Sequence, residues 1–228
     1  MAGVKSDGRT TRWDQHRAER RAELVAAAVR AIDTLGTEAS VADIAAEAGV
    51  SKPVLYRYFS DKDELHAAVG SWAADLLLQR IVEAVTAPAA ARDRVTAGVA
   101  AYVDTLAEHP AAFLLLTAPR TGGGDPLADG RTRIAAKFTR ILGEVLRDLG
   151  GDAGAAEPWA HSLVGMGDAV GRWWLERRTL SRGAAVRYLA DLIWHGLAGA
   201  LAEHGVDLTA FGDDSVVVHL LPREEDTP

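Results

Sequence analysis

The stretch AGVSKPVLYRYFSDKDEL, in the first third of the chain, carries cationic and phenolic side chains at a spacing that could bind a polyanion. Leu55 and Phe59 lie four residues apart, as the buried face of a short helix requires. With that face turned inward, Lys52, Tyr56 and Arg57 must point outward. Such a helix fits the major groove of DNA, where base edges present hydrogen-bond donors and acceptors. The stretch therefore predicts a DNA-reading helix.

Lys62 lies in the first turn of the following helix. A cation there opposes the helix dipole and slightly lowers stability. A bound phosphate would reverse that sign, because the same turn offers free backbone N–H groups to an anion. Taken alone, Lys62 could equally be a solvated surface lysine. Beside two tyrosines and a groove-sized helix, a phosphate contact is favoured.

The elements around this stretch form a small unit. A first helix over about 15–35 precedes SVADIAAEAG, where Ser40 and Asp43 have the spacing of a capping box. Gly49 allows the left-handed turn into the next helix, which has Ser51 at its N-cap. Two short helices joined by a glycine turn and packed on a longer one make a helix-turn-helix. Its miniature core is expected to consist of Ile44, Ala45, Val50, Leu55 and Phe59.

The rest of the chain also has helical periodicity, so the fold class is all-α. Gly- and Pro-rich stretches such as TGGGDPLADG predict mobile connectors. Further helices are expected at 60–85, 92–108, 110–118, 131–149, 157–178 and 181–204. The chain then divides into an arm (1–14), a DNA-binding domain (15–62), a helical ligand-binding and dimerisation domain (63–205) and a tail (206–228). Within the tail, SVVVHLL indicates a short strand or an extended segment.

Composition is that of a soluble globular protein, with 48% hydrophobic and 25% charged residues among 228. The absence of cysteine excludes disulfides and thiolate metal sites. Apolar runs are too short to span a membrane, and the N-terminus lacks the apolar region of a signal peptide. A cytoplasmic protein without a membrane partner is expected.

Charge is unevenly distributed along the chain. The net charge is −7, yet residues 1–62 hold ten Lys and Arg against nine Asp and Glu. An acidic body with a basic end fits a protein that presents one end to a polyanion. Lys5, Arg9 and Arg12 precede the first helix and could contact DNA or form a flexible tail.

Catalytic and cofactor motifs are absent. The seven histidines show no metal-ligand spacing, and GGGDPLADGRT lacks the Gly-Lys-Ser/Thr of a phosphate loop. VGMGDAVG follows no strand and does not have the G-x-G-x-x-G spacing, and no G-x-S-x-G elbow occurs. No metal, no cofactor and no enzymatic activity are expected.

SVADIAAEAGVSKPVLYRYFSDKDEL resembles the N-terminal domain of the tetracycline-repressor (TetR) family of bacterial transcriptional regulators. The resemblance covers about 15–65; beyond it only helix number and length agree. It implies that Lys52 and Tyr56 face the groove, Lys52 being the likelier base reader of the two. It further implies phosphate contacts, and the whole expected DNA-binding set is Ser40, Ser51, Lys52, Pro53, Val54, Tyr56, Arg57, Tyr58 and Lys62. Val54 stands where threonine is common in the family, so the operator sequence cannot be deduced from the family resemblance.

A dimer is expected, because a single helix-turn-helix reads few base pairs and such proteins bind two half-sites ~34–36 Å apart or multiples of that spacing. The last two long helices are its expected interface. The resemblance implies a four-helix interface from them. An apolar stripe and a small-xxx-small pair supply the expected contacts: Gly167, Gly171, Leu189, Leu192, Ile193, Gly196, Leu197 and Leu201. The alternative is an apolar stripe buried within one chain.

The resemblance also implies a ligand cavity among the middle helices whose occupancy moves the DNA-binding heads. The expected lining is Tyr102, Phe113, Phe138, Met166 and Trp173, each of which could instead be ordinary core. Few charges fall on these stripes, which favours an apolar or amphipathic effector. Some family members sense fatty acyl chains, so that class is one candidate.

Together these features predict a homodimeric DNA-binding transcriptional regulator, a repressor released from its operator by a small, largely apolar ligand. Two alternatives are a helical ligand-binding or protein-interaction module without specific DNA binding, and a helical enzyme built on the larger domain.

Overall fold

A computed structural model describes residues 8–117, 125–203 and 206. It confirms the all-α fold: the part it describes contains helices and no strand. The α-helices are α1 (Gly8–Leu35), α2 (Val41–Glu47), α3 (Lys52–Leu55), α4 (Lys62–Thr86), α5 (Ala91–Glu108), α6 (Pro110–Thr117), α7 (Ala128–Asp148), α8 (Ala156–Arg177) and α9 (Arg182–Glu203). Single 3₁₀ turns precede α2 (Gly36–Glu38) and α8 (Ala153–Ala155).

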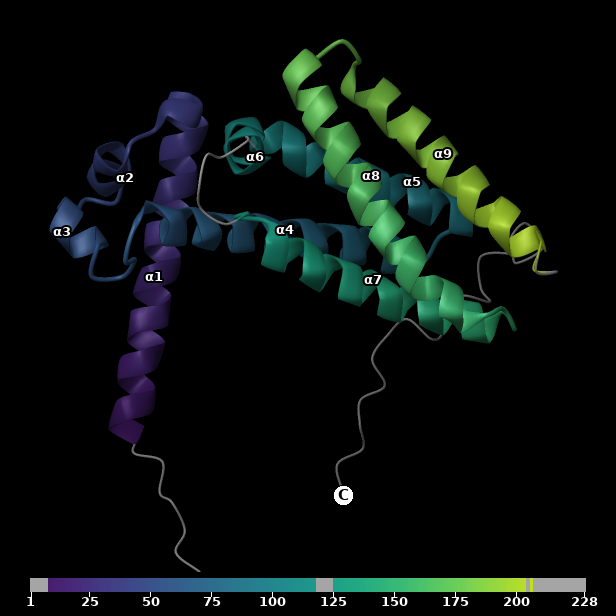
Figure 1. Cartoon of the computed structure of the whole chain (residues 1–228), viewed down its shortest axis with the longest axis horizontal. Helices are drawn as coiled ribbons and strands as arrows, with labels where there is room; N and C mark the ends of the chain where they lie inside the picture. Colours follow the sequence, from purple (N-terminus) through teal and green to yellow (C-terminus); the bar gives the residue numbers. More distant parts are fainter. Residues whose placement is uncertain (1–7, 118–124, 204–205, 207–228) are drawn as a thin grey trace, which may run out of the picture.

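Helices α1, α2 and α3 form a head at one end of the molecule, and α4 runs from it into the body (Figure 1). The expected miniature core is present. Ile44, Ala45, Leu55 and Phe59 are buried, and Val50 is half-buried against them. They pack on the apolar stripe of α1, where Leu24 and others are almost fully covered. The head therefore encloses a core of its own.

Local hydrogen bonds fix the ends of α2. Ser40 accepts a hydrogen bond from the Asp43 N–H, and the Asp43 carboxylate accepts from the Ser40 N–H at 2.9 Å. The Ser40 hydroxyl also donates to this carboxylate, and these bonds lower the pKa of Asp43. Gly49 has φ +65°, the left-handed conformation that glycine adopts without strain. The predicted capping box and glycine turn are both confirmed.

The start of α4 is also capped through side chains. Asp61 is the N-cap and accepts from the Glu64 N–H at 2.7 Å. The Glu64 carboxylate in turn accepts from the Ser60 N–H, which lowers the pKa of Glu64. Asp61 and Glu64 thus fix the first turn of α4 from both sides.

The body consists of α4 to α9. α5 packs on both α4 and α9, and α7 packs on α8 (Figure 1). α8 also lies against α5, where the Tyr102 hydroxyl donates to the Gly167 carbonyl at 2.6 Å. A Cβ on Gly171 would approach the Tyr102 hydroxyl to 2.0 Å, so this contact requires glycine.

Three boundaries differ from the sequence prediction. α1 begins at Gly8, so residues 8–14 of the expected arm are helical; no proline interrupts that segment. α3 ends at Leu55, after which the Arg57 and Tyr58 N–H groups bond three residues back in tighter turns. α7 begins at Ala128, inside the stretch expected to be a connector. Lys5 and the tail from 207 onward lie outside the described residues, as does the expected SVVVHLL segment.

Replacing Phe59 with alanine should lower the free energy of unfolding by ~3–5 kcal/mol, because its ring fills the head core and is only 1% exposed. The matched change Tyr56→Ala should stay within about 0.5 kcal/mol, since Tyr56 is 45% exposed. Urea unfolding followed by circular dichroism measures both. Equal losses would contradict the orientation of α3 described here.

Candidate nucleic-acid interface and effector cavity

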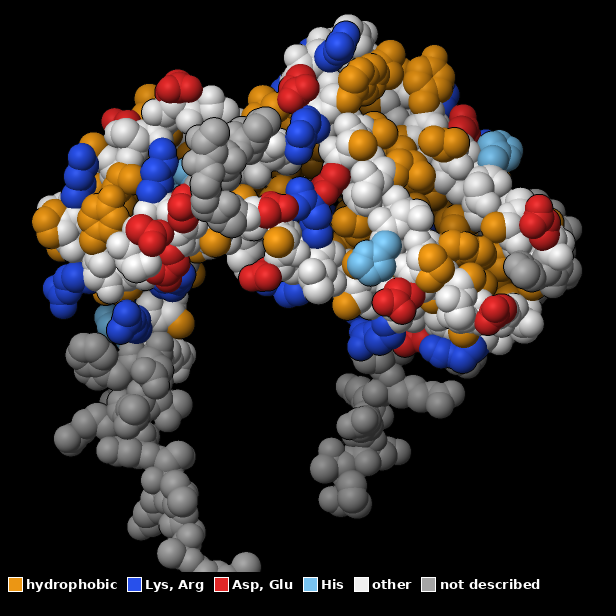
Figure 2. Space-filling model, viewed as in Figure 1, with side chains coloured by type: hydrophobic (Ala, Val, Ile, Leu, Met, Phe, Trp, Pro, Cys, Tyr) orange, Lys and Arg blue, Asp and Glu red, His pale blue; other side chains and the backbone are white. Residues whose placement is uncertain are grey.

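The exposed side of α3 carries the residues expected to read DNA. Lys52, Tyr56 and Arg57 are exposed, while Leu55 and Phe59 on the other side are buried. Of the other predicted DNA-binding residues, Ser40, Ser51, Pro53 and Lys62 are exposed, and Val54 and Tyr58 are half-buried. All nine predicted DNA-binding residues are therefore at least partly accessible to solvent. Lys and Arg side chains are visible on the head among acidic ones (Figure 2).

Arg21 of α1 holds this surface in place. Its guanidinium lies 4.3 Å from the centre of the Phe59 ring, donates to the Tyr58 carbonyl, and pairs with Glu64 at 2.9 Å. One side chain therefore connects α1 to the turn after α3 and to the start of α4. The sequence analysis missed this role, because Arg21 follows Arg20 in a basic stretch and no pattern distinguishes the two.

Ser51 and Lys62 lie where a DNA backbone could be met. Ser51 occupies the N-cap position of α3 with extended backbone, as predicted, although its hydroxyl makes no capping hydrogen bond. Lys62 is the first residue of α4 and is exposed. Its position at a helix N-terminus remains compatible with a phosphate contact.

A cavity of about 310 Å³ lies in the body between α4, α5, α7, α8 and α9. Its lining is almost wholly apolar and includes Leu77, Ile81, Val99, Phe138, Trp159 and Trp194. The few polar groups on its wall are Arg94, Tyr102, Arg131 and Asp168. Its size lies at the lower end of the ~300–1,000 Å³ typical of ligand pockets.

The expected cavity residues are only partly correct. Tyr102 and Phe138 line the cavity, and Phe113 lines a smaller hollow of about 50 Å³ beside it. Met166 instead packs half-buried against the main core, and Trp173 is 41% exposed on the surface. Helical periodicity gives the apolar side of α8 but does not show which of its residues border an empty space.

The polar wall of the cavity is hydrogen-bonded across α5, α7 and α8. Arg131 pairs with both Asp168 and Asp125. Burial, together with the negative charge of Asp168, raises the pKa of the Tyr102 phenol, so the hydroxyl stays protonated and donates to α8. Sequence reasoning missed Arg131 and Asp168, which are distant in sequence and carry no motif.

Six of the eight expected dimer-interface residues make contacts within their own protomer. Gly167 and Gly171 pack against Tyr102 of α5. Four apolar residues of α9 line the cavity: Leu189, Ile193, Leu197 and Leu201. Their part in a dimer interface stays a prediction, because one stripe pattern serves equally for packing within a chain and between chains.

The outer side of α8 and α9 is nevertheless apolar and open. Leu192 is 60% exposed, Tyr188 and Trp173 are also exposed, and no atom lies within 4 Å of a Cβ built on Gly196. Hydrophobic side chains gather over these two helices on the face seen in Figure 2. We call Trp173, Tyr188, Leu192 and Gly196 the outer face.

The described residues contain neither a metal-site cluster nor a single helix that could cross a membrane. No cluster of three or more His, Asp or Glu side chains there could hold a metal ion. No single described helix is long and apolar enough to cross a membrane; α5 and α6 pass such a test only as a pair bent by 90°.

Two family models match the chain. Residues 24–69 match the model described as bacterial regulatory proteins, tetR family, and residues 80–208 match the tetracyclin repressor-like C-terminal domain. A relative, the HTH-type transcriptional regulator Rv0472c of Mycobacterium tuberculosis, is 35% identical over 210 residues, covering 91% of this chain and 89% of its own. The HTH-type transcriptional activator FasR of Mycolicibacterium smegmatis is 32% identical, covering 80% and 84%.

Solved structures agree with these matches. A tetR-family transcriptional regulator from Streptomyces coelicolor superposes with a TM-score of 0.61 at 26% identity, covering 92% of each chain. FadR from Bacillus subtilis, solved in complex with stearoyl-CoA, superposes with a TM-score of 0.60 at 18% identity, covering 75% of this chain and 96% of its own. With a helix-turn-helix head and a matching helical body, the chain belongs to the TetR family of bacterial transcriptional regulators, proteins that bind DNA and are not enzymes.

Proposed function

We propose that this regulator is a cytoplasmic homodimer that binds an operator through α3 and is released from it, as a repressor, by a small apolar or amphipathic effector. The observation that carries the proposal is the orientation of α3. Its cationic and phenolic side is exposed while Leu55 and Phe59 anchor the other side in the head core. A helix held in this way can enter a major groove.

In the proposed complex, Lys52 reads base edges and Tyr56 lies beside it in the groove. Ser51, Tyr58 and Lys62 contact phosphates, which position the head without reading sequence. Arg21 supports the arrangement, because it fixes the turn carrying Tyr58 relative to the start of α4. A module that has lost specific DNA binding is the alternative. Selection of bound duplexes from a random pool separates the two, since only a regulator enriches a defined sequence.

We propose the outer face as the dimer interface. Trp173, Tyr188 and Leu192 are exposed there, and exposed apolar side chains grouped on one surface are typical of an association site. Gly196 has open space beside it, so a partner helix could approach closely. A twofold pair would present two heads to half-sites on one DNA duplex.

We propose the body cavity as the effector site. Its apolar wall suits an alkyl or aromatic group. FadR of Bacillus subtilis, which shares the fold, was solved with stearoyl-CoA, which supports a fatty acyl compound as one candidate class. A screen by thermal shift identifies ligands, because a compound that binds only the folded state raises the melting temperature.

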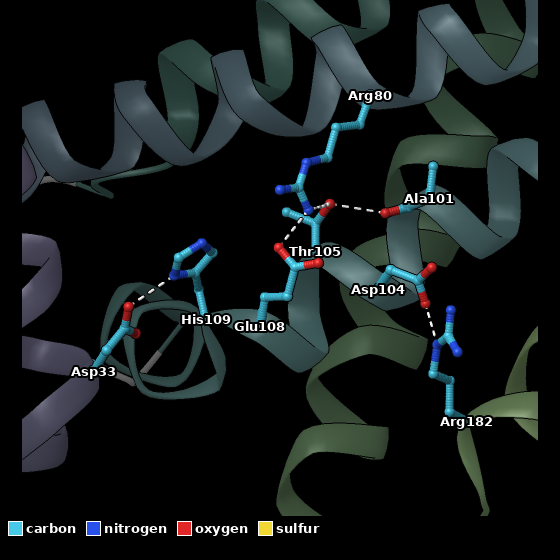
Figure 3. Close-up of polar contacts among 8 residues, drawn as sticks. All are labelled: Asp33, Arg80, Ala101, Asp104, Thr105, Glu108, His109 and Arg182. Atoms are coloured by element: carbon cyan, nitrogen blue, oxygen red, sulfur yellow. Dashed lines mark hydrogen bonds and ion pairs between the residues drawn. The ribbon is translucent and has the colours of Figure 1, made fainter.

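Helix α5 connects the proposed effector site to the head. At its C-terminal end, His109 Nδ1 lies 2.7 Å from the carboxylate of Asp33 of α1 (Figure 3). The His109 ring also meets the ring of Trp72 of α4 edge-on. Glu108 accepts from Arg80 of α4 at 2.6 Å in the same view. Because α5 also contributes Tyr102 to the cavity wall, an effector that shifts α5 acts on α1 through His109.

A switch of this kind requires unequal effector affinity for the two arrangements of the heads. The direction of regulation depends on where the operator lies relative to the promoter. We propose that this regulator represses transcription. Activation is the opposite possibility, and the relative FasR is named a transcriptional activator. Transcription in vitro from a promoter carrying the selected site decides between them.

Replacing Lys52 with alanine should relax preference at one or two base pairs, costing ~1–3 kcal/mol there. Lys62→Ala should instead weaken binding similarly on all sequences and reduce the salt slope by about one, because a phosphate contact releases counterions. Fluorescence anisotropy on operator and random duplex across a salt series measures both, with Arg147→Ala on α7 as a control. Equal losses from Lys52→Ala on both duplexes would reject base reading.

Introducing a charge on the outer face, as Leu192→Glu, should shift the dimer to monomer, because a carboxylate would be buried without a partner. Ala136→Glu on the exposed side of α7 is the matched control and should leave the dimer intact. Analytical ultracentrifugation reports the outcome. A Leu192→Glu protein that remains dimeric would place the interface elsewhere.

Removing the head–body pair with Asp33→Asn should reduce the effector's influence on DNA affinity by ~2–30-fold while leaving effector binding unchanged. Glu47→Gln is the matched control, since Glu47 pairs with Arg30 at 2.8 Å within the head. The measurement compares the DNA Kd with and without an effector found by thermal shift. Unchanged coupling in Asp33→Asn would show that the signal bypasses His109.

A further inference from the structure

We infer that Arg94 binds the anionic group of the effector, so that the cavity takes an amphiphile with a negative head and an alkyl chain. The inference rests on the proposed effector site and specifies its chemistry. Arg94 lies on the first turn of α5 and is part of the cavity wall. It is nevertheless one of the few buried charged residues in the body, with 6% of its surface exposed.

Arg94 lacks an acidic partner within the described residues. Its Nε donates to the Ala89 carbonyl at 2.8 Å, which ties down the loop between α4 and α5. No carboxylate of the described chain lies within ion-pair distance of its guanidinium, and no aromatic ring there stacks on it. One neutral hydrogen bond uses one of five donors, while the positive charge remains uncompensated.

Covering most of an arginine without giving it a counterion carries a desolvation cost, because no ion pair offsets it. The terminal nitrogens of Arg94 make no hydrogen bond in the described chain but keep accessible surface, since none of its buried side-chain nitrogens lacks a partner. Arginine cannot avoid this cost by losing its proton. Such a group at the wall of an otherwise greasy cavity is well placed to bind an anion, since a carboxylate or phosphate would supply the missing charge through forked hydrogen bonds.

The other charges around the cavity are already matched. Arg131 is paired with Asp168 and Asp125. Arg92, two residues before Arg94, holds Asp191 of α9 at 2.9 Å. Of the three charged residues that line the cavity, Arg94, Arg131 and Asp168, Arg94 is therefore the one without an ion-pair partner in the described chain.

The two polar side chains that α5 contributes to the cavity wall are far apart along the helix. Arg94 and Tyr102 are eight residues apart on α5, which is ~12 Å along the helix axis. Val95, Gly98 and Val99 line the wall between them. An anionic group at Arg94 would therefore leave its alkyl chain along an apolar surface that ends at the hydrogen-bonded Tyr102.

The test uses decanoate and decan-1-ol, two probes with the same chain length and different heads. Both are titrated into the full-length protein at pH 8, below their aggregation limits, and the signal is tryptophan fluorescence, because Trp159 and Trp194 line the cavity. Decanoate should bind the wild type about tenfold or more tightly than decanol, the range of a charge-assisted hydrogen bond. Decanoyl-CoA is a third arm, which distinguishes a free carboxylate from a phosphate-bearing head.

In Arg94→Met, decanoate should fall to the affinity of decanol, while decanol binding should persist. Persistent decanol binding shows that the variant is folded, because a misfolded variant would lose binding of both probes. The ratio of the two affinities is therefore informative even if stability falls. Arg140→Met, an exposed arginine of α7 outside the lining, should keep the wild-type ratio. Tighter binding of decanoyl-CoA that also depends on Arg94 would assign the anion as phosphate rather than carboxylate.

Equal affinity of the two wild-type probes, or an unchanged ratio in Arg94→Met, would overturn the role of Arg94 while leaving an apolar effector site in place. Absence of binding by all three probes would overturn the inferred ligand class. Because these titrations contain no DNA, neither result bears on operator binding, which the random-pool selection tests separately.

Discussion

Burial of one side of α3 is the constraint on which the nucleic-acid interface depends. Leu55 and Phe59 are almost completely covered by the head core, which leaves a four-residue helix little freedom to rotate. Arg21 adds a contact to the Phe59 ring and an ion pair with Glu64. The exposed position of Lys52 is thus a consequence of packing on the opposite side, and the head can present a fixed chemical surface without a long recognition helix.

The body uses the same helices for two purposes. The inner sides of α8 and α9 border the cavity, where Leu189 and Trp194 contribute apolar wall. Their outer sides expose Tyr188 and Leu192. Both surfaces are apolar, so these helices show only modest amphipathicity. If a ligand binds between the helices and a second protomer packs outside them, as proposed, both act on one layer of structure, and effector occupancy would then be coupled to dimer geometry.

The sequence predicted the head better than the body for a physical reason. Capping boxes, glycine turns and a four-residue apolar repeat are local, and Ser40, Gly49 and Leu55 behave as those patterns require. The cavity and the interface depend on which helices meet. Gly171 and Leu189 carry stripes that fit an interface or a core equally well, and only the fold assigns them to the core. Arg94 belongs to no sequence motif, and its proposed role follows only from its burial in the cavity wall without an acidic partner.

Because α4 is long and continuous, it can act as a lever between the cavity and the head. The helix contains 25 residues without interruption, or ~37 Å, with Lys62 at one end and the cavity residues Leu77, Ile81 and Val85 in its second half. A stiff rod of that length amplifies angle into displacement: a tilt of about 5° swings its tip by ~3 Å. If the cavity binds an effector as proposed, such a lever would turn a sub-ångström rearrangement around the bound molecule into a misfit of the head with the spacing of a DNA helix.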